Sequence, residues 1–173
     1  NLKLRLADKA IQIDRAAKTV TTAAGETLPY DALVLATGSY PFVPPLPGKG
    51  RDSCFVYRTI EDLEAISAAG RTSKIGVVVG GGLLGLEAAK ALKDMNLATH
   101  VVEFAPRLMA VQVDEGGGRI LRRKIEQLGV TVHTGKNTQA IVDGENCRHR
   151  MNFADGSFLE TDLILFSAGI RPR

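Results

Sequence analysis

Residues 74–103, KIGVVVGGGLLGLEAAKALKDMNLATHVVE, decide the fold of this chain. Residues 75–79 form an apolar, β-branched run, which is typical of a strand buried on both faces. A glycine-rich turn follows over residues 80–85, and strong helix formers then continue to about residue 95. A second apolar run over residues 98–102 ends at Glu103. The stretch therefore predicts a strand, a glycine turn, a helix and a second strand that has an acid at its end.

The glycines of this turn fit the pattern G-x-G-x-x-G as Gly80, Gly82 and Gly85. The first glycine permits a tight turn, the second lets the backbone approach a pyrophosphate, and the third lets the helix pack closely on the strand. The helix N-terminus favours an anion, because its N–H groups are unpaired and its dipole is positive there. An ordinary glycine turn is the alternative, which the strand before it, the helix after it and the acid disfavour. The residues of this turn expected to form the NAD(H)-binding site are Gly80, Gly81, Gly82, Leu83, Leu84 and Gly85.

Glu103 follows the third glycine at about the spacing, roughly 20 residues, at which an acid binds the 2′-hydroxyl of an adenosine ribose. A carboxylate there repels a 2′-phosphate, so Glu103 indicates NAD(H) in preference to NADP(H). Arg107 lies only a few residues further on and leaves NADP(H) open, since an arginine accommodates the 2′-phosphate.

The composition excludes several classes of function. The chain has 173 residues, 45% hydrophobic content and a net charge of +3, which suit one domain, or one domain and part of another. Arg122, Arg123 and Lys124 form a basic cluster within a predicted helix, which indicates a solvated face, and the 5% aromatic content disfavours a nucleic-acid stacking surface. No apolar run is long enough to cross a membrane and no signal peptide is evident, so we expect a soluble, cytoplasmic protein without nucleic-acid or membrane partners.

The cysteines and histidines do not predict a metal site. Cys54 and Cys147 are far apart and form no C-x-x-C motif, so both are interpreted as small core residues. His100, His133 and His149 stand singly in strand-like runs, where packing or exposed positions are favoured over metal ligation.

The segment before the glycine turn begins as a predicted antiparallel meander. Its strands are expected at residues 2–6, 11–14, 18–22 and 27–28. Residues 31–36 then predict a buried strand that ends in Ala36-Thr37-Gly38, and the proline-rich residues 41–50 predict an extended linker. A short strand over residues 54–57 and a helix over residues 58–69 follow, with Thr59 as the cap and Ile60, Leu63 and Ile66 on the apolar side.

The segment after Glu103 predicts a loop, a helix and more strands. The helix is expected to start near Asp114, with Ile120, Leu121, Ile125 and Leu128 facing inward, although Gly116, Gly117 and Gly118 are unfavourable in a helix. A strand over residues 130–134 precedes a three-stranded meander at residues 138–142, 148–153 and 157–160. The last strand, residues 163–166, continues into Ser167-Ala168-Gly169-Ile170-Arg171-Pro172. The predicted fold class is α/β, a Rossmann-like three-layer domain with a parallel sheet and a β-meander.

These motifs together resemble the pyridine nucleotide-disulfide oxidoreductase family, whose members carry two dinucleotide-binding domains. The resemblance rests on the Ala-Thr-Gly strand end, the proline crossing, the glycine turn with Glu103, and the closing Ala-Gly-Ile-Arg-Pro segment. Four longer words are similar to the large subunits of assimilatory NAD(P)H nitrite reductases within this family. The words are ATGSYP at 36–41, FVYRTIEDL at 55–63, GGGLLGLE at 80–87 and HVVEFAP at 100–106.

The resemblance implies a flavin-dependent NADH reductase in which an NAD domain interrupts a FAD domain. Residues 1–43 would end the first FAD segment, residues 44–165 would form the NAD(H) domain, and residues 166–173 would begin the returning FAD segment. The resemblance places Ala36, Thr37 and Gly38 beside FAD, and it places Ala168 and Gly169, on the returning strand, in the NAD(H)-binding site. Glu87 matches a glutamate near the nicotinamide, although an ordinary helix carboxylate is an equal interpretation, and no catalytic acid or base is assigned.

The resemblance also implies segments outside these residues. The first G-x-G-x-x-G, for FAD, is expected before residue 1, and an Fe–S cluster and sirohaem are expected in later domains that reduce nitrite to ammonia. The expected partners are NADH, those acceptor domains, a small nitrite reductase subunit, and a second copy paired through the strands of residues 1–40. A fragment of this kind would bind NAD(H) without turning over alone. The alternatives are a rubredoxin or ferredoxin reductase or an NADH oxidase of the same family, or a non-catalytic NADH-responsive binding module.

Overall fold

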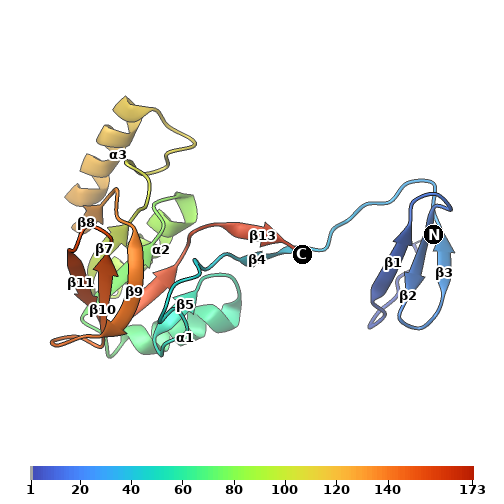
Figure 1. Cartoon of the computed structure of the whole chain (residues 1–173), viewed down its shortest axis with the longest axis horizontal. Coiled ribbons are helices and arrows are strands. Elements are labelled where there is room, and N and C mark those ends of the chain that lie inside the picture. Colours follow the sequence, from blue (N-terminus) through green and yellow to red (C-terminus); the bar gives the residue numbers. More distant parts are fainter. Residues whose placement is uncertain (1) are drawn as a thin grey trace. The chain divides into compact units, whose positions relative to one another are not determined.

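The computed structural model describes residues 2–173, which form two compact units that divide between Thr37 and Gly38 (Figure 1). The first unit contains an antiparallel sheet in the order β1-β2-β3. Its strands are β1 (Ala10–Asp14), β2 (Thr19–Thr22) and β3 (Thr27–Pro29). The meander predicted over residues 11–28 is therefore confirmed.

Two of the strands predicted for the first unit do not form, so these predictions were wrong. Residues 2–6 and residues 31–36 form no strand, and the side chains of Leu4, Leu6 and Val34 are exposed. Alternating or continuous apolar residues favour extended backbone, but a strand also requires a neighbouring strand to receive its hydrogen bonds. The described residues supply no such neighbour for either segment.

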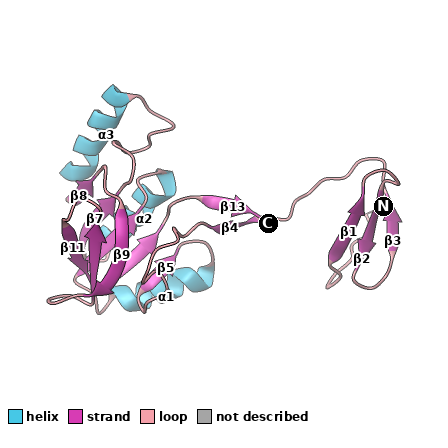
Figure 2. Ribbon diagram, in the orientation of Figure 1, coloured by secondary structure: helices cyan, strands magenta, loops and turns pink. Residues whose placement is uncertain are grey.

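The second unit is built on a five-stranded parallel sheet in the order β5-β12-β6-β7-β8. Figure 2 shows strands and helices intermixed in this unit. The strands are β5 (Cys54–Val56), β6 (Ile75–Val79), β7 (Ala98–Val102), β8 (Val130–His133) and β12 (Leu163–Phe166). Three helices accompany it, α1 (Ile60–Gly70), α2 (Leu83–Asp94) and α3 (Glu115–Gln127). A three-stranded antiparallel sheet in the order β11-β10-β9 completes the unit, with strands β9 (Thr138–Asp143), β10 (His149–Phe153) and β11 (Phe158–Thr161).

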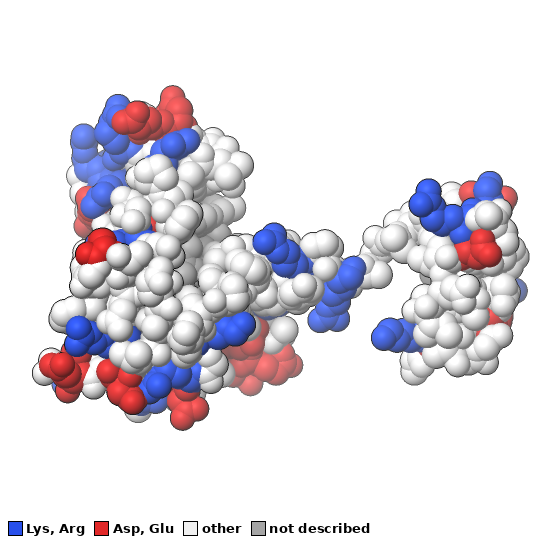
Figure 3. Space-filling view, in the orientation of Figure 1, with Lys and Arg blue, Asp and Glu red and all other residues white. Residues whose placement is uncertain are grey.

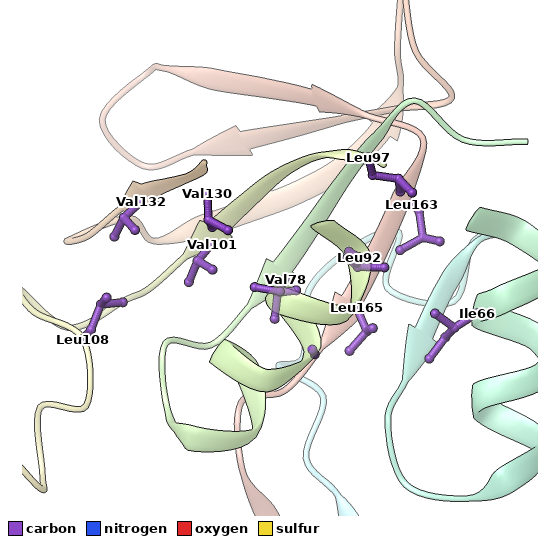
Figure 4. Close-up of a cluster of buried hydrophobic side chains, with 12 residues drawn as sticks. Ile66, Val78, Leu92, Leu97, Val101, Leu108, Val130, Val132, Leu163 and Leu165 are labelled. Carbon is purple, nitrogen blue, oxygen red and sulfur yellow. The ribbon is translucent and has the colours of Figure 1, made fainter. Parts of the chain in front are cut away.

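Alternate residues of the central strands enter two separate cores, so the unit has three layers. Val78 of β6 packs with Leu92 of α2 and Leu165 of β12 in the core between the sheet and the helices (Figure 4). Val77 and Val79 point to the opposite face, where the meander covers them with Ile141, Met151 and Phe153. A strand buried on both faces needs a continuous apolar run, which is why residues 75–79 lack polar side chains. The predicted α/β fold class is confirmed.

The helices α1 and α3 start where the sequence predicts, but their apolar faces are only partly covered. Thr59 caps α1 and Asp114 caps α3. Leu121 and Ile125 pack against the core, whereas Ile120 and Leu128, predicted to face inward, are exposed. On α1, Ile66 is buried and Ile60 and Leu63 are exposed. The helical pattern indicates which side is apolar, but it does not indicate how wide a stripe the sheet covers.

Gly118, in the first turns of α3, has a structural reason to be glycine. A Cβ on Gly118 would lie 3.0 Å from the Cδ atom of Arg107, so the absence of a side chain makes room for that arginine. The side chain of Asp114 accepts a hydrogen bond of 2.7 Å from the N–H of Gly117. Close packing with Arg107 therefore offsets the low helix propensity of this segment.

A two-stranded antiparallel ribbon joins the two ends of the second unit. Its strands are β4 (Ser39–Pro41) and β13 (Ile170–Pro172). The sequence predicts residues 41–50 as an extended linker, but Pro41 pairs within this ribbon and Leu46 is buried against the meander core. Proline is acceptable in β4 because a two-stranded ribbon leaves its other edge free of ladder hydrogen bonds.

Candidate dinucleotide site

A cavity of about 710 Å³ lies in the second unit at the carboxyl ends of the parallel strands. Val79 and Gly80 of the β6 end, Glu103 after β7 and Ser167 after β12 contribute to its wall. Ligands of open parallel sheets bind at this edge, where the loops that leave neighbouring strands create a crevice. The volume is within the range of small-molecule and cofactor sites.

The three glycines of the motif have different surroundings. Gly80 has a φ of 120°, and a Cβ there would overlap the backbone carbonyl of Ser167. A Cβ on Gly85 would overlap the carbonyl of Gly80, so this glycine sets how closely α2 packs on the turn. A Cβ on Gly82 would meet no atom within 4 Å. Gly80 and Gly85 are thus required by the protein's own packing, whereas Gly82 faces open space beside the cavity.

The start of α2 is left without a side-chain cap. Its N-cap residue is Gly82, no side chain accepts a hydrogen bond from its first turn, and no acidic residue lies in that turn. The adjacent residues Leu83 and Leu84 are exposed and line the cavity. Unpaired N–H groups and the positive end of the helix dipole therefore favour an anionic group at this position.

The carboxylate of Glu103 is held by the backbone on both of its oxygens. Oε2 accepts a hydrogen bond of 2.6 Å from the N–H of Gly81, and Oε1 accepts one of 2.7 Å from the N–H of Ala105. Each carboxylate oxygen has a second lone pair that can accept from a hydroxyl. The carboxylate is therefore fixed at the cavity wall and still able to accept further hydrogen bonds.

The structure brings most of the predicted site residues together, but not all of them. Ala168 and Gly169 line the cavity beside Ser167. Arg107 does not line it, because its guanidinium donates to the carbonyl oxygens of Val113 at 3.1 Å and Ala110 at 2.9 Å. Arg107 thus holds the loop that leads to α3.

The structure also shows where Glu87 and the residues predicted to contact the flavin lie relative to the cavity. Glu87 is exposed on α2 and does not line the cavity. Ala36 and Thr37 belong to the first unit, and Gly38 begins the second unit with a φ of 75°. The cavity is lined by residues of the second unit.

The structure pairs two histidines that the sequence treats as single. His100 of β7 and His133 of β8 stack with ring centroids 5.3 Å apart, and His100 Nδ1 lies 3.1 Å from His133 Nε2. Burial lowers the pKa of both imidazoles, and for His100 the neighbouring His133 lowers it further. The two rings belong to neighbouring strands, and no group of three potential metal ligands is present among residues 2–173.

Comparison with known proteins agrees with this geometry. The family model described as pyridine nucleotide-disulphide oxidoreductase matches residues 1–173. The chain belongs to this family. It is 58% identical over 173 residues to the large subunit of nitrite reductase (NADH) from Escherichia coli K12, which covers 99% of this chain and 20% of that protein.

Two further family members show how widely the resemblance extends. A nitrite reductase [NAD(P)H] from Bacillus subtilis is 40% identical, over 99% of this chain and 21% of its own length. The crystal structure of the ferredoxin reductase for the CYP199A2 system from Rhodopseudomonas palustris superposes with a TM-score of 0.82 and 28% identity, over 95% of this chain and 41% of that one. The chain spans about a fifth of the length of the nitrite reductases it matches.

The glycine turn and Glu103 predict a dinucleotide site from the sequence, but the sequence assigns no role to three other residues of the cavity. Arg58, Phe104 and Lys136 line it, and they come from three segments that are distant in the chain. They follow β5, β7 and β8, and because these strands are parallel within one sheet, their carboxyl ends lie at the same edge. None of the helices among residues 2–173 is long and apolar enough to span a membrane.

Proposed function

We propose that this chain is the NADH-binding portion of a flavin-dependent nitrite reductase large subunit. In the whole protein, electrons would pass from NADH through FAD to Fe–S and sirohaem centres, where nitrite is reduced to ammonia. The observation that carries the proposal is the 58% identity to the E. coli large subunit across nearly the whole chain, glycine turn and Glu103 included. Residues 1–43 and 166–173 are proposed as parts of the FAD domain, and residues 44–165 as the NAD(H) domain.

The start of α2 is the proposed pyrophosphate site. The N–H groups that follow Gly82 have no side-chain acceptor, and the open space at Gly82 lets a phosphate approach the backbone. No acidic residue in the first turn repels the phosphates. The apolar side chains of Leu83 and Leu84 exclude water from one side of the bound dinucleotide.

Glu103 is the proposed acceptor for the hydroxyls of the adenosine ribose. Its carboxylate is positioned by Gly81 and Ala105, so little side-chain freedom is lost on binding. A 2′-phosphate would stand against this carboxylate, and Arg107 is turned away toward Ala110 and Val113. Both features support NADH as the preferred coenzyme.

Two glycines support the proposed approach of a flavin. Gly38 and Gly169 both have positive φ, and a Cβ on either would meet no atom within 4 Å. Backbone of this kind can lie against a flat ring or a phosphate without steric conflict. When bound, FAD would supply the hydride acceptor, and the role of Ala168 and Gly169 is to hold the nicotinamide end of the cavity open toward it.

Calorimetric titration with NADH and with NADPH, on the wild type and on Glu103→Ala, tests the dinucleotide site. We expect tighter binding of NADH by the wild type, and loss of that preference in the variant, because the carboxylate no longer distinguishes a hydroxyl from a phosphate. Equal affinity of the wild type for the two coenzymes would contradict the role of Glu103. The absence of any binding would contradict the site itself.

A ferredoxin reductase is the second candidate, because the Rhodopseudomonas ferredoxin reductase shares the fold over 95% of this chain. The intact protein distinguishes the two candidates: NADH-dependent reduction of nitrite supports the first, and reduction of an added ferredoxin without nitrite reduction supports the second. A module that only senses NADH would change its partners on binding NADH and reduce neither acceptor.

Association with a second copy and with an acceptor protein is part of the same proposal, as is a cytoplasmic location. The exposed apolar side chains of residues 2–6 and 31–36 support association of the isolated chain through the first unit. Light scattering at high concentration tests this, with a dimer expected. A monodisperse monomer would contradict it.

A further inference from the structure

Arg58 is a cation of the cavity whose guanidinium has no hydrogen-bond or ion-pair partner among residues 2–173. Three charged residues among the described residues 2–173 line the cavity, namely Arg58, Glu103 and Lys136. Glu103 accepts two backbone hydrogen bonds, and Lys136 Nζ donates to Asp155 Oδ2 at 2.5 Å and to Ser157 Oγ at 2.8 Å. The guanidinium of Arg58 makes no hydrogen bond or ion pair with the described residues.

The backbone that carries Arg58 is fixed in place. The carboxylate of Asp62 accepts hydrogen bonds from the N–H groups of Arg58, at 3.0 Å, and Thr59, at 2.8 Å. This acid therefore serves the start of α1 and does not pair with the guanidinium. An exposed arginine on a rigid backbone at the rim of a cavity is suited to act on a ligand through its charge.

The strand order indicates which half of the dinucleotide lies near Arg58. Glu103 follows β7 on one side of β6, whereas β12 and then β5 lie on the other side. Arg58 follows β5 closely, so it is roughly 10 Å from the line of β6, since neighbouring strands are about 4.8 Å apart. With the adenosine ribose at Glu103 and the pyrophosphate at α2, the nicotinamide half extends toward Ala168, Gly169 and Arg58.

The nicotinamide ring carries a positive charge in NAD⁺ and none in NADH, and the rest of the molecule is the same in both. A cation beside the ring therefore disfavours the oxidised form, while its attraction for the two phosphates is equal in both forms. Like charges several ångströms apart at a partly solvated site change affinity by about three- to tenfold.

We propose that Arg58 is a specificity-determining residue that makes the cavity select the reduced dinucleotide over the oxidised one. This inference rests on the proposed NADH site. Its consequence is that NAD⁺ leaves more readily than NADH after hydride transfer, which keeps the cavity available to the reduced coenzyme.

The ratio of the NAD⁺ Kd to the NADH Kd tests the proposal, because effects on the shared phosphates cancel in it. In Arg58→Gln we expect the ratio to fall about three- to tenfold. Arg58→Lys retains the charge and should keep most of the wild-type ratio. Arg71→Gln removes an arginine from the other end of α1, which does not line the cavity, and should leave the ratio unchanged.

Two further measurements separate the possible failures. ADP-ribose lacks the ring, so Arg58→Gln should change its affinity by the same factor as that of NADH. In the wild type the ratio should shrink as ionic strength rises from about 0.01 M to about 1 M, because the Debye length falls from about 30 Å to about 3 Å. An unchanged ratio in Arg58→Gln, with both coenzymes bound, would overturn the proposal. Failure of the wild type to bind either coenzyme would instead overturn the proposed function, and this inference with it.

Discussion

The N-termini of α1 and α2 solve the same chemical problem in opposite ways. At α1, the side chain of Thr59 accepts from the N–H of Asp62 at 3.3 Å, and Asp62 accepts in return from the N–H of Thr59. At α2, Gly82 supplies no side chain and the first turn contains no acid. The α1 start is completed by the chain itself, whereas the α2 start leaves its donors available beside a cavity.

This difference indicates that α2 lacks a stabilising cap at the position where the dinucleotide is proposed to bind. Replacement of a Ser, Thr, Asp or Asn cap by alanine lowers the stability of a helix by about 1 kcal/mol. A single polar residue at the N-cap is therefore enough to stabilise a helix start. Figure 3 shows Lys and Arg side chains beside Asp and Glu side chains over α3. Arg119 and Arg122 of this helix pair with acids on the same helix, as is common on a charged helix surface. The start of α2 has no side-chain cap and no acid in its first turn, which supports a ligand as the partner of its N–H groups.

Gly80→Ala, in the turn before α2, should cause the largest loss of stability. The positive φ costs about 1–3 kcal/mol for a residue with a side chain, and overlap with the Ser167 carbonyl adds about as much. We expect a loss of about 2–5 kcal/mol in the free energy of unfolding, measured in urea. Gly82→Ala is the matched control and should change it by less than about 1 kcal/mol, because its Cβ meets open space and alanine is only a poorer N-cap than glycine. Similar losses in both variants would show that the two glycines do not differ as described.

Thr59→Ala should have the next largest effect, because it removes the cap of α1. We expect a loss of about 1 kcal/mol in the free energy of unfolding and no change in the Kd for NADH. Thr59→Ser retains the hydroxyl and should restore most of the stability. A large change in NADH affinity would contradict the separation between the two helix starts.

Gly82→Ser should make the α2 start resemble that of α1. A serine cap is a few tenths of a kcal/mol better than glycine, so stability should rise slightly. The new side chain would occupy the approach to the N–H groups, and we expect NADH affinity to fall about tenfold, equivalent to about 1.4 kcal/mol. Unchanged affinity, measured by calorimetry, would show that no phosphate binds there.

Lowering the pH should reduce the stability of the α1 start, whereas the first turn of α2 contains no acidic residue to titrate. A hydrogen bond from its own backbone N–H, and then one from Thr59, lower the pKa of Glu61. The stabilisation is present above the unfolded pKa, about 4.3, and is lost as the pH falls through the lower folded pKa. A carboxyl NMR titration should show this lowered pKa and its partial return toward the ordinary value in Thr59→Ala. An identical titration curve in the variant would show that Thr59 does not lower the pKa of Glu61.

The parts of the fold that could be predicted from the sequence are those set by local pattern. The β6–α2–β7 unit follows from an apolar run, three spaced glycines and strong helix formers, and residues 98–102 end as expected at Glu103. The cap of α1 follows from Thr59 and Asp62. Each of these signals lies within a few residues of the feature it specifies.

The remaining features depend on partners that are distant in the chain. The pattern of residues 2–6 describes a strand, but pairing decides whether one forms. Arg107 was assigned to the site by its distance from Glu103, yet the gap left by Gly118 directs it to the α3 loop. Arg58 lies in the word FVYRTIEDL, which supports the family resemblance without giving this residue a role, and it reaches the cavity because β5 is parallel to the other strands of the same sheet.

The β4–β13 ribbon brings residues 39–41 beside residues 170–172, with Ile170 opposite Pro41. The two ends of the described second unit therefore lie side by side, which is the arrangement that lets a domain be inserted into a loop of a host without disturbing either fold. The same adjacency makes the unit suitable for circular permutation: a short linker between its ends, with new termini at the exposed turn around Gly156, would change the order of its elements and keep every pairing of the parallel sheet.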